Sequence, residues 1–400
     1  MLSKRARNVD VCEDDNPSDE EHIEAVSLYL IKKRRLQTQL VCSFLQAAQS
    51  VVNSYVEYRG GMNAILNFDI KDPIFDWDTY CDKLFAQDFR FSKSDVEIIL
   101  DVFVNVAKLP SEIVSYAGDK ASLRIAFLCM CMKYAWPTRL GKICQIFGKG
   151  TSWISRIVKT LRQLLFTKFH HKMRNPSIIS FDKLQEYTAA VARKSGITVC
   201  FGFLDGTVRP VCKPSEAQAE FYTGKDRLHA LKYQIVSTPD GMIQHIDGPW
   251  PGRRHDGHML TSAPLSSGTA VLHTWLMSHP KTVHGTAHVI YADAGYTTQA
   301  CIETPWPDAD FNLEHAAYNE ALAASRIAVE WEFGHILELW ASHHMTPQQK
   351  VLSNQKIGQV YCVSAFLTNV FNCMHPKKTS KYFGVQPPTV GAYIASMLQL

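Results

Sequence analysis

Apolar residues recur at helical spacing through the first half of the chain and change to strand-like runs after about residue 198. Residues 21–58 and 76–106 show the helical spacing, and Ser92 stands where a helix start needs a capping side chain. Beyond the change, the pattern predicts three strands, a helix, a fourth strand and then helices over 321–340 and 357–373. This order predicts an α/β domain, a mixed sheet flanked by helices, preceded by an all-α region.

A helix-turn-helix is predicted just before the change of pattern. An apolar helix over 123–134 stops near Pro137, and a short helix covers 139–147. Gly148-Lys149-Gly150 then forms a turn before a longer helix over 152–166. The alternative interpretation of the same pattern is a plain helical bundle with a basic surface.

Charge favours the DNA-binding interpretation of this region. Between Asp119 and Asp182 the chain carries twelve Lys and Arg residues and no acidic residue. An excess of cations favours a polyanion, because phosphate contacts and counterion release supply most of nucleic-acid binding. We expect the longer helix to enter the major groove with its exposed residues, and the candidates are Ser152, Trp153, Ser155, Arg156 and Lys159.

These changes divide the chain into predicted parts. They are an acidic disordered tail (1–20), a helical N-terminal region (21–118), the basic helix-turn-helix-like region (119–182), the α/β domain (195–375) and a C-terminal tail (376–400). No internal repeat is apparent.

Composition narrows the class of protein. The chain has 400 residues, of which 46% are hydrophobic and 20% charged, as expected of a globular protein with a large core. Its apolar runs are shorter than the ~18 residues that a membrane span needs, and the N-terminus lacks an apolar signal core. The eleven cysteines include no Cys-x-x-Cys pair, which disfavours a disulfide framework or a four-cysteine zinc site. We therefore expect a protein of a reducing compartment inside the cell.

Three acidic residues are candidates for chemistry. Asp205 and Asp293 directly follow apolar strand-like runs, where open α/β sheets place reactive groups. Glu330 lies on the predicted helix over 321–340, four residues after Arg326. Converging carboxylates repel one another unless a cation lies between them, and Mg²⁺ or Mn²⁺ prefers carboxylate oxygen. The structural alternative is that the aspartates are turn or strand-end caps, and periodicity does not choose between Glu330 and Glu332.

Several short motifs occur together in the second half of the chain. They are Leu204-Asp205-Gly206-Thr207, Gly224-Lys225, the segment 229–234, Trp250-Pro251-Gly252, His255-Asp256, Ala292-Asp293-Ala294-Gly295-Tyr296 and the segment 326–334. In this order they resemble the DDE superfamily endonuclease domain of PIF/Harbinger-type transposases and of their domesticated nuclease relatives, over about residues 201–373. The pair Arg253-Arg254 departs from the small residues that these relatives usually carry before His-Asp.

The resemblance implies a ribonuclease-H-like fold with a three-carboxylate active site. Asp205 would end the first strand, Asp293 the fourth, and Glu330 would lie on the helix that follows. The three would be catalytic and would hold two divalent ions, Mg²⁺ or Mn²⁺, with Asp256 as an auxiliary ligand or a helix cap. Lys225, Arg253 and Arg254 would hold DNA phosphates, although ordinary surface charge explains them equally well.

The implied function is that of a metal-dependent DNA endonuclease or transposase that cleaves phosphodiester bonds at element ends, at terminal inverted repeats. The alternative is a domesticated, catalytically silent DNA-binding or regulatory protein that retains the fold. The resemblance also implies a separate Myb-like helper protein, a homo-oligomer on DNA and a nuclear location, or a cytoplasmic one until a partner imports the protein. No membrane association is expected.

Overall fold

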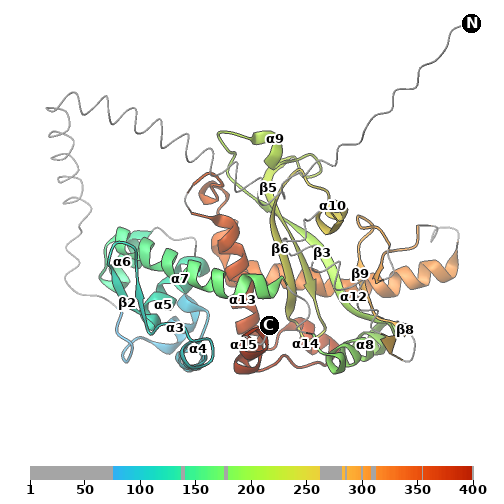
Figure 1. Cartoon of the computed structure of the whole chain (residues 1–400), viewed down its shortest axis with the longest axis horizontal. Coiled ribbons are helices and arrows are strands. Elements are labelled where there is room, and N and C mark those ends of the chain that lie inside the picture. Colours follow the sequence, from blue (N-terminus) through green and yellow to red (C-terminus); the bar gives the residue numbers. More distant parts are fainter. Residues whose placement is uncertain are drawn as a thin grey trace, which may run out of the picture.

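The computed structural model describes most of the chain from residue 75 onward (Figure 1). The described ranges are 75–136, 140–174, 179–261, 282–283, 286–298, 301–307, 312–353 and 355–398. The expected acidic tail over 1–20 and the expected helix over 21–58 lie outside these ranges.

Helices dominate the first part of the described chain. They are α3 (Asp82–Phe89), α4 (Lys93–Asn105), α5 (Leu123–Ala135), α6 (Leu140–Phe147), α7 (Thr151–Met173) and α8 (Phe181–Ser195). Ser92 caps α4 as predicted: its hydroxyl accepts from the Asp95 amide, and the Asp95 carboxylate accepts from the Ser92 amide. A two-stranded hairpin, β1 (Glu112–Val114) and β2 (Lys120–Ser122), was not predicted because each strand is only three residues long.

A mixed sheet forms the second part, as the pattern of apolar runs predicted. Its strands are β3 (Cys200–Pro210), β4 (Tyr222–Thr223), β5 (Leu228–Ser237), β6 (Ile243–Pro251), β9 (Val289–Ala292) and β10 (Ile302–Glu303). The order is β10-β9-β3-β5, with β4 and β6 both pairing with β5. Strand β3 is parallel to β9 and antiparallel to β5, so it joins the parallel and antiparallel parts of the sheet. The short strands β7 (Thr282–Val283) and β8 (Thr286–Ala287) pair separately.

Helices pack against this sheet and connect it to the helical part. Helices α8 and α12 (Leu313–Leu339) contact β3, and α13 (Ile357–Met374) contacts β6 and α7. The remaining short elements are α9 (Gln218–Phe221), α10 (Asp256–Thr261), η2 (Ala341–His344) and η3 (Thr346–Gln348). The architecture is compatible with the fold of a DDE nuclease. None of the described helices is both long and apolar enough to cross a bilayer.

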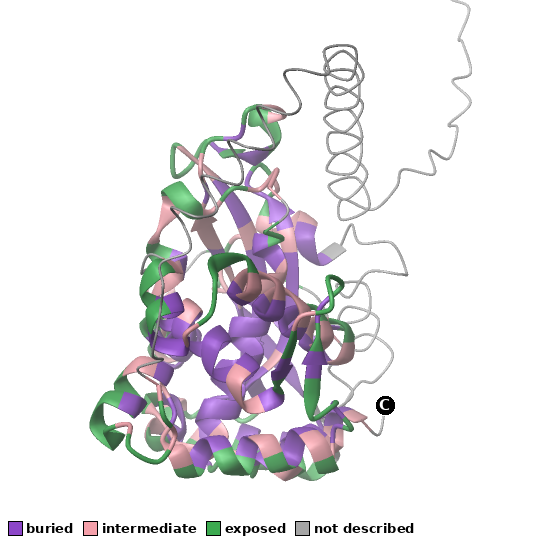
Figure 2. Cartoon of the chain, turned by 90° about the vertical axis from the view of Figure 1, so that its left-hand side faces the viewer, coloured by how far each residue is buried: buried purple, intermediate pink, exposed green. Residues whose placement is uncertain are grey.

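One hydrophobic core runs through both parts. Figure 2 shows the buried residues gathered on the sheet and on the helices that face it, with exposed residues on the outer helices. Phe169 of α7 stacks on Phe366 of α13 with ring centroids 4.5 Å apart, and Phe103 of α4 lies against the same ring. The long helix α7 therefore joins the helical part to the helix that covers β6.

The chain after residue 376 differs from the predicted tail. It forms α14 (Lys378–Phe383) and α15 (Val390–Leu398), and α15 packs against α4, α7 and α13. Val390, Tyr393, Ile394 and Met397 are buried, at the spacing of one helical face. These apolar contacts hold the C-terminal segment on the core.

Candidate active site

Asp205 and Asp293 lie next to each other on parallel strands. The last paired residues of β3 and β9 are Leu204 and Ala292, and each aspartate is the next residue along its strand direction. Asp205 does not end β3 as expected, because antiparallel pairing with β5 continues to Pro210. The aspartate instead stands in the middle of β3, at the point where its parallel neighbour stops.

Arg326 links Asp205 to Glu330. Arg326 Nη1 donates to Asp205 Oδ2 at 2.8 Å, and its Nη2 lies 3.4 Å from Glu330 Oε1. The Asp205 side chain is 15% exposed, whereas that of Glu330, one turn further along α12, is 55% exposed. The positive charge that the sequence required between the carboxylates is thus supplied by an arginine of the same helix.

The electrostatics of Asp205 show that the carboxylates lie close together. Burial raises the pKa of Asp205 to about 6. The Arg326 charge and a hydrogen bond from the Gly206 amide lower this pKa, while the charges of Asp293 and Glu330 raise it. A buried carboxyl group with a raised pKa beside other acids is typical of functional sites. A bound cation would stabilise its negative charge and reduce the repulsion between the acids.

The structure separates Glu330 from Glu332, which periodicity could not do. Glu332 is 2% exposed and accepts hydrogen bonds from Thr379 Oγ1 at 2.6 Å and Asn372 Nδ2 at 3.2 Å. Burial raises its pKa to about 7. Glu332 therefore belongs to the packing of α12 against α13 and α14, while Glu330 lies on the side of Asp205.

Asp256 lies near this group but has a cation of its own. As the first residue of α10, it pairs with Lys232 Nζ at 3.1 Å, and Lys232 also donates to the Arg254 carbonyl at 2.7 Å. Gly206 allows the approach, because a Cβ at that position would lie 3.3 Å from Asp256 Oδ1. The described contacts of Asp256 are thus those of an ion pair that fixes the start of α10.

Tyr296 is a residue of the site that the sequence analysis did not select. It is 5% exposed, and its hydroxyl has no hydrogen-bond partner among the described residues. Burial raises its pKa, and the charges of Asp256, Asp205 and Asp293 raise it further, so the phenol lies within reach of all three. The only sequence feature that pointed to Tyr296 was its position in the motif from Asp293 to Tyr296. Hydrophobic periodicity cannot show that its hydroxyl is buried beside acidic residues.

The donor chemistry of the site suits a divalent ion, although the side chains are not gathered around one point. Mg²⁺ and Mn²⁺ prefer hard oxygen atoms, which the carboxylates of Asp205, Asp293 and Glu330 provide. The raised pKa of Asp205 shows that the charges around it do not fully stabilise its carboxylate. Among the described residues, however, no three acidic, histidine or cysteine side chains form a metal-binding group. Arg326 forms ion pairs with Asp205 and Glu330, so the carboxylates can bind a divalent ion only when the Arg326 side chain moves away.

Basic residues around the site differ in how free they are. Lys225 is exposed in the turn between β4 and β5. Arg253 is largely exposed and lies 3.9 Å from Glu220, and Arg254 lies 3.1 Å from the His258 ring. Lys225 and Arg253 are therefore accessible from solvent, whereas Arg254 is held against α10.

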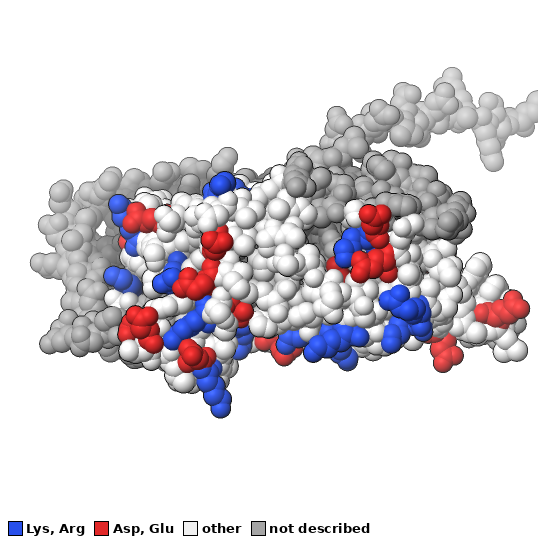
Figure 3. Space-filling model, turned by 90° about the horizontal axis from the view of Figure 1, so that it is seen from below, with Lys and Arg blue, Asp and Glu red and all other residues white. Residues whose placement is uncertain are grey.

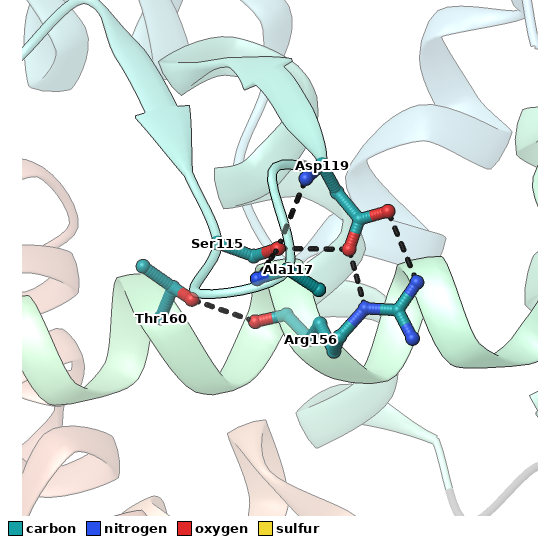
Figure 4. Close-up of polar contacts among 5 residues, drawn as sticks. All are labelled: Ser115, Ala117, Asp119, Arg156 and Thr160. Atoms are coloured by element: carbon teal, nitrogen blue, oxygen red, sulfur yellow. Dashed lines mark hydrogen bonds and ion pairs between the residues drawn. The ribbon is translucent and has the colours of Figure 1, made fainter.

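The expected helix-turn-helix segments form α6 and α7, but the candidate residues of α7 do not all face solvent. Arg156 pairs through two nitrogen atoms with Asp119, whose carboxylate also accepts from Ser115 Oγ (Figure 4). This contact ties the β1–β2 hairpin to α7. Ser152 is exposed and Trp153 is partly covered, while Ser155 and Lys159 line a cavity.

Acidic residues from outside the basic interval between Asp119 and Asp182 neutralise part of its positive charge. Four of its cations pair with acids outside it: Lys120 with Glu112, Arg124 with Glu97, Arg156 with Asp119 and Arg174 with Asp247. Figure 3 shows the result on one face, where basic and acidic side chains alternate over the helical part. Folding therefore brings in acids that are distant in sequence, which a count of charges along the chain cannot show.

Comparison with known proteins finds a similarity for residues 204–369. No curated protein and no solved structure matches the chain. Residues 204–369 match the family model described as DDE superfamily endonuclease, a range that begins beside Asp205 and includes Asp293 and Glu330. The match supports a nuclease or transposase type of function, with DNA as the bound substrate. The chain thus contains, over these residues, a domain similar to the DDE superfamily endonucleases.

Proposed function

We propose that this protein is a divalent-metal-dependent DNA nuclease of the DDE type, of the PIF/Harbinger group, with Asp205, Asp293 and Glu330 as its catalytic carboxylates. The observation that carries the proposal is the pair of aspartates at adjacent positions of parallel β3 and β9, with Glu330 drawn toward them by Arg326. The strand order around β3 is compatible with the ribonuclease-H-like fold that this group implies.

The carboxylates have distinct tasks in this proposal. Asp205 is only 15% exposed and the charges of both Asp293 and Glu330 act on it, so it is the group best placed to share ions with both. Asp293 is held in place, since its Oδ1 accepts from the Gly295 amide at 2.9 Å. Glu330 is more than half exposed, so it is the carboxylate that DNA would reach from solvent.

Mg²⁺ or Mn²⁺, when bound, would activate water or a DNA 3′-hydroxyl and stabilise the leaving oxygen. The chain's own contribution is to bury Asp205, orient Asp293 through the Gly295 amide and place the Tyr296 hydroxyl beside the acids. The exposed Lys225 and Arg253 are candidates to hold the backbone phosphates of the substrate. Asp256 serves in this scheme through its ion pair with Lys232.

A second candidate function rests on Arg326. Since the arginine neutralises two carboxylates and no metal-binding group is formed among the described residues, a catalytically silent DNA-binding or regulatory protein would carry the same features. The two candidates differ in one property: only the nuclease requires the divalent ion to displace the arginine.

The test is cleavage of DNA that bears the cognate terminal inverted repeats, in Mg²⁺ or Mn²⁺. Asp205→Asn, Asp293→Asn and Glu330→Gln should each abolish cutting, while Glu338→Gln, an exposed change on the same α12, should leave it intact. Equal cutting by the parent and the three variants would refute the assignment. Element-end specificity, strand transfer, a Myb-like helper, a homo-oligomer on DNA and a nuclear location belong to the same proposal and rest on the sequence resemblance.

A further inference from the structure

A cavity of about 370 Å³ lies between the helical part and the segment that follows α12. Helices α5, α6 and α7 form one wall, and residues of η2, η3 and α13 form the other. It shares no lining residue with the acid cluster around Asp205. Its size suits a small ligand, at the lower end of the range of small-molecule sites.

The charge of this cavity is entirely positive. Lys133, Lys159 and Arg162 line it, and no Asp or Glu does. Other cations of the same region have acidic partners, but within the part of the chain that the structure describes none is shown for these three. The Arg162 charge lowers the pKa of both lysines, in addition to the effect of their burial. Arg162 is therefore close enough to Lys133 and to Lys159 to repel the charge of each.

The buried guanidinium of Arg162 gives the strongest indication that the cavity binds an anion. Arg162 is only 6% exposed, and its one hydrogen bond to the described residues runs from Nη1 to the Gln355 carbonyl at 2.7 Å. Its Nε and Nη2 have no partner among the described residues. A buried guanidinium without a counter-charge is strongly unfavourable, which makes such an arrangement rare unless a ligand completes it.

Two further buried hydrogen-bond donors also indicate a ligand with acceptor atoms. Tyr134 and Trp136 also line the cavity, and their buried atoms Oη and Nε1 have no hydrogen-bond partner among the described residues. Together with Arg162, four donor atoms thus await acceptors around one cavity. A phosphate group offers several acceptor oxygens and a negative charge, and the planar fork of arginine matches its geometry.

We propose that the cavity between α5, α7 and α13 is a binding site for a phosphate group, held by Arg162, Lys133 and Lys159 with Tyr134 and Trp136 as neutral donors. The depth of Arg162 favours a small phosphate compound, of the size of pyrophosphate or a nucleotide, over a DNA duplex. A backbone phosphate of DNA offers the same chemistry, and the test separates the two sources. The inference does not depend on the proposed nuclease function.

The test uses the full chain, calorimetry and melting temperature, with sodium pyrophosphate and inorganic phosphate at constant ionic strength in EDTA. The expected result is saturable binding of pyrophosphate and a rise in the melting temperature. Lys159→Gln and Arg162→Gln should each weaken binding by about tenfold or more. Lys168→Gln, on the same α7 but not lining the cavity, should bind as the parent does. Lys159 is partly exposed, so we expect Lys159→Gln to fold. This variant therefore tests the site even if Arg162→Gln does not fold.

A second arm titrates a short DNA duplex into the same proteins. Binding of DNA that depends on Lys159 and Arg162 but not on Lys168, without binding of pyrophosphate, would assign the site to a backbone phosphate. The proposal is overturned when the parent binds neither small phosphate, and Lys159→Gln, Arg162→Gln and Lys168→Gln all bind DNA as the parent does. It is equally overturned when pyrophosphate binds all the variants with the affinity of the parent.

Discussion

Arg326 Nη1 donates to Asp205 Oδ2 at 2.8 Å, across 121 residues of chain. The contact joins a helix to the middle strand of the sheet and places a fixed positive charge at the edge of an acid cluster. An arginine in this position competes with any divalent cation for the same oxygen atom, which leads to the first prediction.

Arg326→Gln should tighten Mn²⁺ binding. Without the guanidinium, Asp205 and Glu330 lose a counter-charge and the cation meets less competition. We expect a gain in affinity of about tenfold, equivalent to about 1.4 kcal/mol, in calorimetric titrations of the full chain. Weaker binding in the variant would mean that Arg326 organises the carboxylates for the ion and does not compete with it.

Asp205 should make the protein less stable as pH rises. Its pKa is raised from 3.8 to about 6, so between these values the folded state binds more protons than the unfolded state. The contribution of Asp205 to the free energy of unfolding is therefore largest below about pH 4 and falls by up to about 3 kcal/mol as pH rises through 6.

Asp205→Asn should remove this fall and be more stable than the parent at pH 7, in urea unfolding with EDTA present. Glu332, whose pKa is raised from its ordinary value of 4.5 to about 7, adds a fall of the same sign between these values in both proteins, so the difference isolates Asp205. The same slope in parent and variant would contradict the burial of a strained Asp205 carboxylate.

Glu330→Gln and Glu332→Gln should have opposite effects. The first changes an exposed side chain, so it should abolish cutting and alter the free energy of unfolding by less than about 0.5 kcal/mol. The second disturbs buried hydrogen bonds from Thr379 and Asn372, so it should cost about 1 kcal/mol of stability and keep cutting. Cleavage assays paired with urea unfolding check both, and an exchange of the two results would reverse the assignment of the third carboxylate.

Tyr296→Phe should reduce cutting without loss of stability. The hydroxyl is buried beside Asp205, Asp256 and Asp293 with no partner among the described residues, so its removal should leave stability unchanged or raise it by about 1 kcal/mol. We expect cutting to slow by about a hundredfold, because the hydroxyl is placed to orient the reacting groups.

Tyr187→Phe is the matched control for a buried tyrosine. Its hydroxyl donates to Asp240 Oδ2 at 2.7 Å, away from the acid cluster. This variant should lose about 1 to 2 kcal/mol of stability and cut at the parent rate. A Tyr296→Phe protein that also cuts at the parent rate would remove the hydroxyl from the mechanism.

The sequence predicted the elements better than their contacts. Local pattern identified the helix over 357–373, the cap at Ser92 and four strands of the mixed sheet, β3, β5, β6 and β9. The two-residue strands β4 and β10 were not predicted, because they are too short to show a pattern. The strand around Asp205 was predicted too short, since Asp-Gly is a common turn pair and only the pairing of β3 with β5 shows that the strand continues. The helix α15 was predicted as tail, although Val390, Tyr393, Ile394 and Met397 carry its helical spacing.

The site shows the same division. Sequence placed Asp205, Asp293 and Glu330 as candidates, but it could not choose between Glu330 and Glu332, because α12 has polar contacts on more than one side. It also counted Arg156 as free, although Asp119 pairs with it in the fold. Partners that lie far apart along the chain have no periodic signal.

Calorimetric titration of Mn²⁺ into the full chain distinguishes a metal-dependent nuclease from a silent DNA-binding protein. We expect saturable binding to the parent and to Glu338→Gln, with loss of binding by about a hundredfold or more in Asp205→Asn and in Asp293→Asn. Absence of Mn²⁺ binding in the parent, or equal binding in Asp205→Asn and Asp293→Asn, would contradict a metal-dependent nuclease and leave the silent DNA-binding protein as the better account.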